Sequence, residues 1–158
     1  REAACSTGSP PAVAWQRSLD RNLTTAYLVT RALLPGMKTR GYGRIVNVAS
    51  TTGPVAAVRG DTAYAAAKAG LVGFTRAVAL EAAGRGVTVN AVAPGWIATG
   101  SQTEREAAAG RRSPLQRSGT PAEIADVIAF LASRGASYVT GQLIVADGGN
   151  SIVEDHNA

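Results

Sequence analysis

A strand, a long helix and a second strand follow one another between residues 44 and 92, and this order restricts the fold more than any other feature of the chain. The β-branched runs at 44–49 and 87–92 predict the two strands. The apolar spacing over 63–83 predicts the helix between them, which Asp61 or Thr62 can cap. Two strands joined by one helix lie parallel in one sheet, with a right-handed crossover. The sequence therefore predicts an α/β protein.

The remaining segments extend this pattern. Apolar residues at helical spacing predict one long helix from Val13 to about Thr39, stopped by the glycines around Gly41. The segment 99–113 is rich in Ala and Glu and is expected to be helical, Thr120 opens a further helix, and 142–146 is a third strand. The apolar stripe of the long helix consists of Trp15, Leu19, Leu23, Ala26, Tyr27, Thr30, Leu33, Leu34 and Met37.

These elements together predict a doubly wound parallel sheet with helices on both faces. Three strands are few for a sheet covered on both faces. We therefore expect residues 1–158 to form a single domain that corresponds to the C-terminal part of a larger doubly wound domain.

The composition excludes several classes of protein. The chain is 46% hydrophobic and 17% charged, which is typical of a globular protein, and it contains no apolar run of about 20 residues that could span a membrane. Its net charge is +5, but the basic residues are scattered and aromatic residues make up only 5%, so we expect no nucleic-acid partner. Cys5 is the only cysteine, which favours a reducing compartment and predicts a cytoplasmic protein. No metal ion is expected.

Reactive side chains follow the predicted strands at the edge of the sheet where ligands bind in open parallel sheets. Ser50 follows the first strand, and Pro94 and Gly95 follow the second. Tyr64 and Lys68 are four residues apart at the start of a helix, so they share one helix face. That helix begins at the same edge as Ser50, so the sequence predicts that the three side chains converge.

The pairing of Tyr64 and Lys68 suits acid–base chemistry. A free phenol has a pKa near 10, and lowering it by about 3 units requires about 4 kcal/mol of stabilisation of the phenolate. A neighbouring ammonium and the helix N-terminus both act in that direction. Lys68 is one of only two lysines among 16 basic residues. The hydroxyl of Ser50 could donate a hydrogen bond to a carbonyl oxygen on which charge develops.

Five ordered blocks of the sequence resemble the short-chain dehydrogenase/reductase family. Tyr64 to Lys68, with Ser50 lying 14 residues before Tyr64, resembles the family's Tyr-x-x-x-Lys signature. The other blocks are Asn22 with its neighbours, 43–50, 86–99 and 140–149. The resemblance covers about residues 13–150 and is greatest to the branch of 3-oxoacyl-(acyl-carrier-protein) reductases.

This resemblance implies an NAD(P)-dependent oxidoreductase that transfers a hydride between the cofactor and a carbonyl or secondary alcohol. Tyr64 would be the acid/base, and Lys68 would lower its pKa and bind the nicotinamide ribose. Ser50 would orient and polarise the carbonyl, and Asn22 would hold a water molecule of a proton relay.

The same resemblance implies a cofactor site and an assembly. Tyr64 and Lys68 would contact the cofactor, and its nicotinamide end would be lined by Pro94, Gly95, Ile97 and Thr99. The cofactor would be NAD or NADP, with NADP favoured, the segment 100–117 would cover the substrate, and the protein would form a homotetramer or dimer.

The family's first strand and its Gly-rich phosphate-binding turn are absent from this sequence. We favour an N-terminal half that precedes Arg1 over a truncated relic. The competing hypothesis is a non-catalytic fragment that serves as an oligomerisation or structural module, with the two long helices as its interface.

Single residues also have structural alternatives. Tyr64 could be a core tyrosine, Ser50 a turn residue, Asn22 a helix-surface residue and Thr99 a helix cap. We expect the strand asparagines Asn47 and Asn90 to satisfy buried backbone groups.

Overall fold

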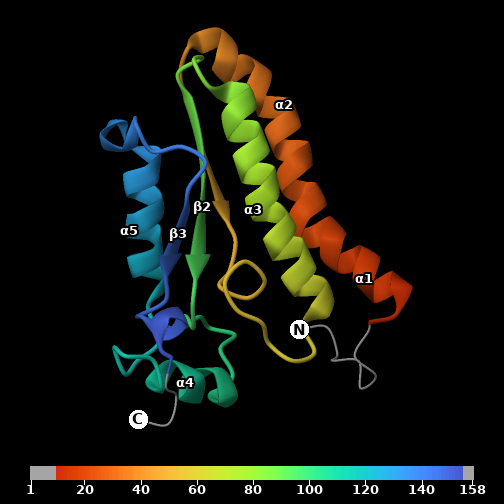
Figure 1. Ribbon diagram of the computed structural model, residues 1–158, viewed down its shortest axis with the longest axis vertical. Coiled ribbons are helices and arrows are strands. Elements are labelled where there is room, and N and C mark those ends of the chain that lie inside the picture. Colours follow the sequence, from red (N-terminus) through yellow and green to blue (C-terminus); the bar gives the residue numbers. More distant parts are fainter. Residues whose placement is uncertain (1–9, 155–158) are drawn as a thin grey trace.

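The computed structural model describes residues 10–154 and shows a parallel sheet between two helical layers (Figure 1). The sheet has three strands, β1 (Gly43–Val48), β2 (Val87–Pro94) and β3 (Leu143–Ala146), in the order β1-β2-β3. Gly43 of β1 lies opposite Val87 of β2, and Ala91 of β2 lies opposite Leu143 of β3. The predicted α/β fold, which is part of a doubly wound parallel sheet, is confirmed.

Helices cover both faces of this sheet (Figure 1). One layer consists of α1 (Ala12–Leu19), a π-helical turn (Asp20–Thr24), α2 (Thr25–Arg40) and α3 (Thr62–Ala82). The other face carries α5 (Pro121–Ala132), and α4 (Glu104–Arg111) lies beyond the carboxyl ends of the strands. Two short 3₁₀ turns complete the described chain, at Arg134–Ala136 and Asn150–Ile152. No helix within residues 10–154 combines the length and the apolar character needed to cross a bilayer.

The long N-terminal helix differs from its prediction. A π-helical turn interrupts it at Asp20–Thr24, and Gly41 ends it with a left-handed φ of 67°, as the glycines predicted. A π-turn contains about one extra residue, which rotates the faces of the following helix by roughly 100°. The predicted apolar stripe is therefore wrong in part: Leu34 is buried, whereas Tyr27 and Leu33 are 45% and 53% exposed.

The core lies on both sides of β2, because successive side chains of a strand point to opposite faces. Toward α3, the fully buried Val89 packs with Val78 and Ala82. Toward α5, Val92 packs with Leu131, and both are fully buried. β2 is therefore the central strand of the described structure.

Two asparagines join the strands to their surroundings. Asn90 donates from Nδ2 to the carbonyl of Val139 at 2.8 Å, and its Oδ1 accepts from the amide of Gln142 at 3.0 Å. This confirms its predicted role in satisfying buried backbone groups. Asn47 instead donates to the hydroxyl of Thr75 at 2.9 Å, so its predicted backbone partner is wrong.

The start of α5 has the expected cap. The Thr120 hydroxyl accepts from the amide of Glu123, whose carboxylate accepts from the Thr120 amide in return. Arg117 donates to both carboxylate oxygens of Glu123, at 2.8 and 2.6 Å. These hydrogen bonds lower the pKa of Glu123 to about 2. The ion pair therefore links Arg117, in the segment before α5, to the first turn of that helix.

Candidate active site

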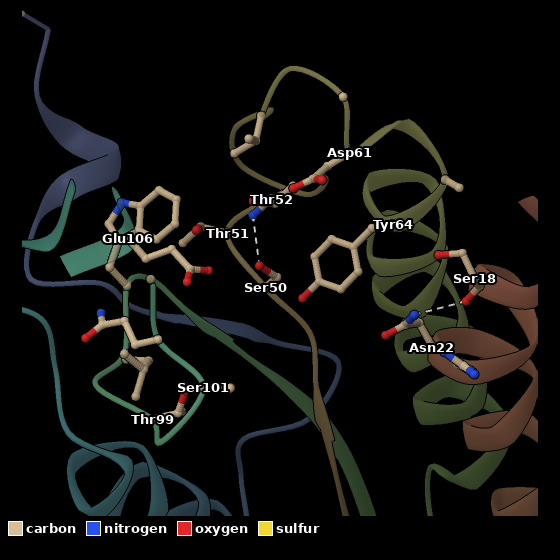
Figure 2. A pocket seen from close by; sticks show the side chains of 18 of the residues that line it. Ser18, Asn22, Ser50, Thr51, Thr52, Asp61, Tyr64, Thr99, Ser101 and Glu106 are labelled. Atoms are coloured by element: carbon tan, nitrogen blue, oxygen red, sulfur yellow. Dashed lines mark hydrogen bonds between the residues drawn. The ribbon is translucent and has the colours of Figure 1, made fainter. Parts of the chain in front are cut away.

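A cavity of about 690 Å³ lies at the carboxyl ends of β1 and β2 (Figure 2). It is built by α1 with the π-turn, by the loop after β1, by the start of α3 and by the segment between β2 and α4. Ligands of open parallel sheets bind at this edge. Six predicted site residues line the cavity: Asn22, Ser50, Tyr64, Gly95, Ile97 and Thr99.

The floor of the cavity is formed where the strands end. The amide of Thr51 donates to the carbonyl of Pro94 at 3.1 Å, and the amide of Gly95 donates to that of Ala146 at 3.1 Å. Pro94 thus supports the floor, and it is not among the lining residues. A Cβ at Gly95 would lie 2.6 Å from Cβ of Asp147. Only glycine therefore fits this crossing of the two strand ends.

Ser50 and Tyr64 approach each other across the cavity. Figure 2 shows the phenolic oxygen of Tyr64, from the first turn of α3, directed toward the side chain of Ser50. The Ser50 hydroxyl accepts a hydrogen bond from the amide of Thr52 at 3.1 Å. A hydroxyl that accepts one hydrogen bond keeps its proton for donation. Ser50 is therefore held by the loop while its O–H can donate to a ligand.

Lys68 lies one helical turn after Tyr64, and its ammonium lies over the face of the Tyr64 ring. Its Nζ is 5.5 Å from the centroid of the Tyr64 ring and donates to the carbonyl of Val48 at 2.8 Å. Burial of this ammonium lowers the pKa of Lys68. Lys68 does not itself line the cavity. The end of β1 thus holds a positive charge against the tyrosine ring.

Asn22 lies on the wall of the cavity opposite Ser50. Its Nδ2 donates to the carbonyl of Ser18 at 3.0 Å, within the irregular stretch of helix (Figure 2). π-turns are frequently found at functional sites, because the extra residue redirects a side chain. The interruption that the sequence did not predict therefore coincides with a predicted site residue.

The segment after β2 forms the remaining wall. Ile97 bridges to Gly119, and the Thr99 hydroxyl lies 3.2 Å from that of Ser101. Thr99 does not cap α4, because Thr103 occupies that position in a capping box with Glu106. The predicted helix at 99–113 is therefore shorter, and its first turn reaches the cavity through Glu106.

Several lining residues were not predicted as site residues, and Ser18 and Asp61 are two of them. Ser18 lies one helical turn before Asn22, and Asp61 lies one turn before Tyr64. Asp61 occupies the N-cap position of α3, but its side chain makes no capping hydrogen bond, so its predicted role is wrong. The three-residue spacing from Tyr64 is the signal that would have placed Asp61 on the same side of the helix.

The loop that carries Ser50 depends on Gly53. Gly53 has a φ of +107°, and a Cβ there would collide with the backbone carbonyl of Ala65 in α3. We expect Gly53→Ala to lower the free energy of unfolding by about 2 kcal/mol, because it adds both strain and a backbone clash. Urea denaturation measures this change.

A matched control lies in α3 itself. A Cβ added at Gly73 would meet no other atom within 4 Å, and the backbone of this residue is helical. Gly73→Ala should raise the free energy of unfolding by about 0.5–1 kcal/mol, the usual gain for alanine in a helix. Equal effects of the two substitutions would contradict the role of Gly53.

The walls of the cavity and their surroundings present apolar, hydroxyl and cationic groups. Ile97 offers an apolar surface, Thr99 a hydroxyl, and Lys68 an ammonium at the adjoining wall. Within residues 10–154 no group of three or more metal-ligating side chains is found.

Comparisons with known proteins agree with this geometry. The profile of the family described as Enoyl-(Acyl carrier protein) reductase matches residues 7–151. A 3-oxoacyl-(acyl-carrier-protein) reductase from Pseudomonas aeruginosa is 47% identical over 140 residues, which are 85% of this chain and 56% of that protein. A reductase of the same name from Synechocystis is 48% identical over 138 residues, which are 85% of this chain and 55% of that protein.

Solved structures of dehydrogenases are also similar to this chain. A putative gluconate dehydrogenase from Agrobacterium tumefaciens has a TM-score of 0.85 and 36% identity over 92% of this chain and 59% of its own. An acetoin dehydrogenase from Salmonella typhimurium has a TM-score of 0.85 and 33% identity over 98% of this chain and 62% of its own. The chain thus spans little more than half the length of the curated relatives that it matches. It belongs to the short-chain dehydrogenase/reductase family.

Proposed function

We propose that this chain is the catalytic, C-terminal portion of a Rossmann-type domain that transfers a hydride between NAD(P)(H) and a carbonyl or secondary alcohol. The observation that carries this proposal is the direction of the Tyr64 hydroxyl, which faces Ser50 in one cavity with the Lys68 ammonium behind its ring. Membership of a family whose relatives are named reductases and dehydrogenases supports it.

The proposed chemistry needs a proton donor and a polarising group at the same carbonyl oxygen. A nicotinamide cofactor, when bound, would supply the hydride that the carbonyl carbon receives. Ser50 donates a hydrogen bond to the carbonyl oxygen, and Tyr64 gives that oxygen its phenolic proton. The ketone thereby becomes a secondary alcohol, and Tyr64 becomes a phenolate. Lys68 stabilises that phenolate through its positive charge.

Asn22 is proposed to hold the water molecule through which Tyr64 regains its proton. Its place on the π-turn, facing the cavity from the wall opposite Ser50, supports this role. One N–H of its amide donates to the carbonyl of Ser18, so its second N–H and its carbonyl oxygen are the groups that would hold the water.

The residues proposed to bind the cofactor lie on the walls of the cavity or next to them. Tyr64 and Lys68 are proposed to bind the nicotinamide ribose, and Ile97 and Thr99 to contact the nicotinamide. Pro94 and Gly95 form the floor beneath them. We propose NADP in preference to NAD as the cofactor.

A homo-oligomer in the cytoplasm is the proposed assembly. Apolar side chains remain exposed on α2 and α3, including Leu28 at 52%, Leu33 at 53% and Leu80 at 80%. Burial of these side chains against a second copy would remove apolar surface from water. The same two helices would serve the alternative, in which the chain is a non-catalytic oligomerisation module.

Cofactor titration tests the proposal. Trp96 lines the cavity, and Trp15 lies on α1 outside it. NADPH and NADH should therefore quench the fluorescence of Trp96 with micromolar affinity. The quench should persist in Trp15→Phe and disappear in Trp96→Phe. If the full-length gene product neither binds a nicotinamide cofactor nor oxidises it in the presence of ketones, the non-catalytic alternative holds.

A further inference from the structure

Asp61 adds a negative charge to the cavity that contains Ser50 and Tyr64. Neither the fold nor the proposed proton transfer uses this charge. Asp61 lies at the start of α3, three residues before Tyr64, and lines the cavity. Figure 2 shows its carboxylate on the same side of the cavity as Thr52, above the side chains of Ser50 and Tyr64.

The carboxylate of Asp61 is uncommitted within residues 10–154. It makes no capping hydrogen bond to α3, and none of the ion pairs or side-chain hydrogen bonds of this part of the chain includes it. The side chain is only partly exposed. An ionised carboxylate accepts hydrogen bonds and cannot donate them, so it favours a ligand that brings a donor.

The other charged groups of the cavity lie on different walls. Glu106 receives hydrogen bonds from the amide and hydroxyl of Thr103 at 2.7 Å, so its carboxylate is held by the cap of α4. Arg17 and Arg21 reach the cavity from α1 and the π-turn. Asp61 is thus the charge on the same helix turn as the proposed proton donor.

We infer that Asp61 determines substrate specificity: it selects carbonyl compounds that carry a hydrogen-bond donor, such as a hydroxyl, on the carbon next to the carbonyl. This inference rests on the proposed function. Ser50, Tyr64 and Asp61 line the same cavity, so a carbonyl compound held by Ser50 and Tyr64 can present a hydroxyl on its neighbouring carbon to the carboxylate. A hydroxyl there donates to the carboxylate, whereas a carboxylate on the substrate is repelled.

The test compares three small ketones with the full-length gene product and its cofactor. Hydroxyacetone and butanone have the same shape and differ only by a hydroxyl in place of a methyl group, and pyruvate places a negative charge at that position. Wild-type protein should prefer hydroxyacetone to butanone. Asp61→Asn should lower this preference in kcat/KM about tenfold, because a charge-assisted hydrogen bond is lost. The same variant should raise kcat/KM for pyruvate several-fold.

Asn is a good N-cap residue, so Asp61→Asn is expected to fold normally. Asp126→Asn is the matched control, because Asp126 is exposed on α5 and outside the cavity. Saturation-transfer NMR without cofactor gives a second readout: the methylene signal of hydroxyacetone should weaken in Asp61→Asn and persist in the control.

The outcomes separate this inference from the proposed function. If butanone is reduced while Asp61→Asn leaves all three ketones in their wild-type ratio, the specificity role of Asp61 is wrong and the oxidoreductase stands. An increase for pyruvate without a loss for hydroxyacetone would reduce the inference to charge exclusion and overturn the donor selection. No turnover of any ketone with either cofactor would overturn both.

Discussion

Tyr64→Phe is expected to lower kcat/KM for ketone reduction about a thousandfold, with no loss of folding and with only a small loss of cofactor affinity from the missing contact to the ribose. The substitution removes one oxygen from a side chain that projects from the first turn of α3 into the cavity. In the proposed mechanism, the substrate's carbonyl oxygen would then receive the hydrogen bond of Ser50 but no proton from residue 64. Because the ring remains, the contact with the Lys68 ammonium is kept.

The measurement is steady-state reduction of a ketone, together with cofactor titration of the same preparation. Tyr138→Phe is the matched control, since Tyr138 is fully exposed and lies away from the cavity. Turnover of Tyr64→Phe at the rate of this control would reject Tyr64 as the proton donor.

Lys68→Met is expected to lower kcat/KM about a hundredfold and to displace the pH profile of alcohol oxidation to higher pH. In the proposed mechanism, oxidation requires Tyr64 as a phenolate, and the ammonium beside the ring is the charge that would favour this form. Methionine has a similar length but no charge, so it loses both this stabilisation and the hydrogen bond to Val48. The displaced profile distinguishes an electrostatic role from a structural one.

Stability gives an independent check on Lys68. Its pKa is lowered from 10.5 by burial, so the folded state binds fewer protons than the unfolded state at pH values below 10.5 and above the folded pKa. The free energy of unfolding should therefore rise with pH in that window in the wild type, and less so in Lys68→Met. Lys38→Met is the control, because Lys38 is the other lysine and lies on α2. If the free energy of unfolding of Lys68→Met varied with pH as it does in this control, the electrostatic role of Lys68 would be contradicted.

Local sequence signals predicted much of the fold. The strand, helix and strand between 44 and 92 lie within about two residues of their expected bounds, because β-branched runs and glycine stops are local signals. The Thr120 cap and the left-handed Gly41 were recognisable for the same reason. The edge at which Ser50 and Tyr64 meet followed from the rule for parallel sheets.

Features that depend on tertiary contacts were not predictable. The π-turn around Asn22 does not follow from apolar spacing, and its rotation of α2 explains why Leu33 is exposed. Asp61 has the residue type and position of a cap, and only the packing of the loop against α3 shows that its carboxylate faces the cavity instead. Lys68 was expected near the phenol, but its hydrogen bond to Val48 depends on where β1 ends.

Isotope transfer tests the central claim most directly. The full-length gene product is mixed with a ketone and a reduced cofactor deuterated on the nicotinamide carbon that donates the hydride, and the alcohol is analysed by mass spectrometry and NMR. The account predicts one deuterium on the carbinol carbon for the wild type and loss of this product in Tyr64→Phe. An alcohol without deuterium, or equal labelling by both proteins, would contradict direct hydride transfer assisted by Tyr64.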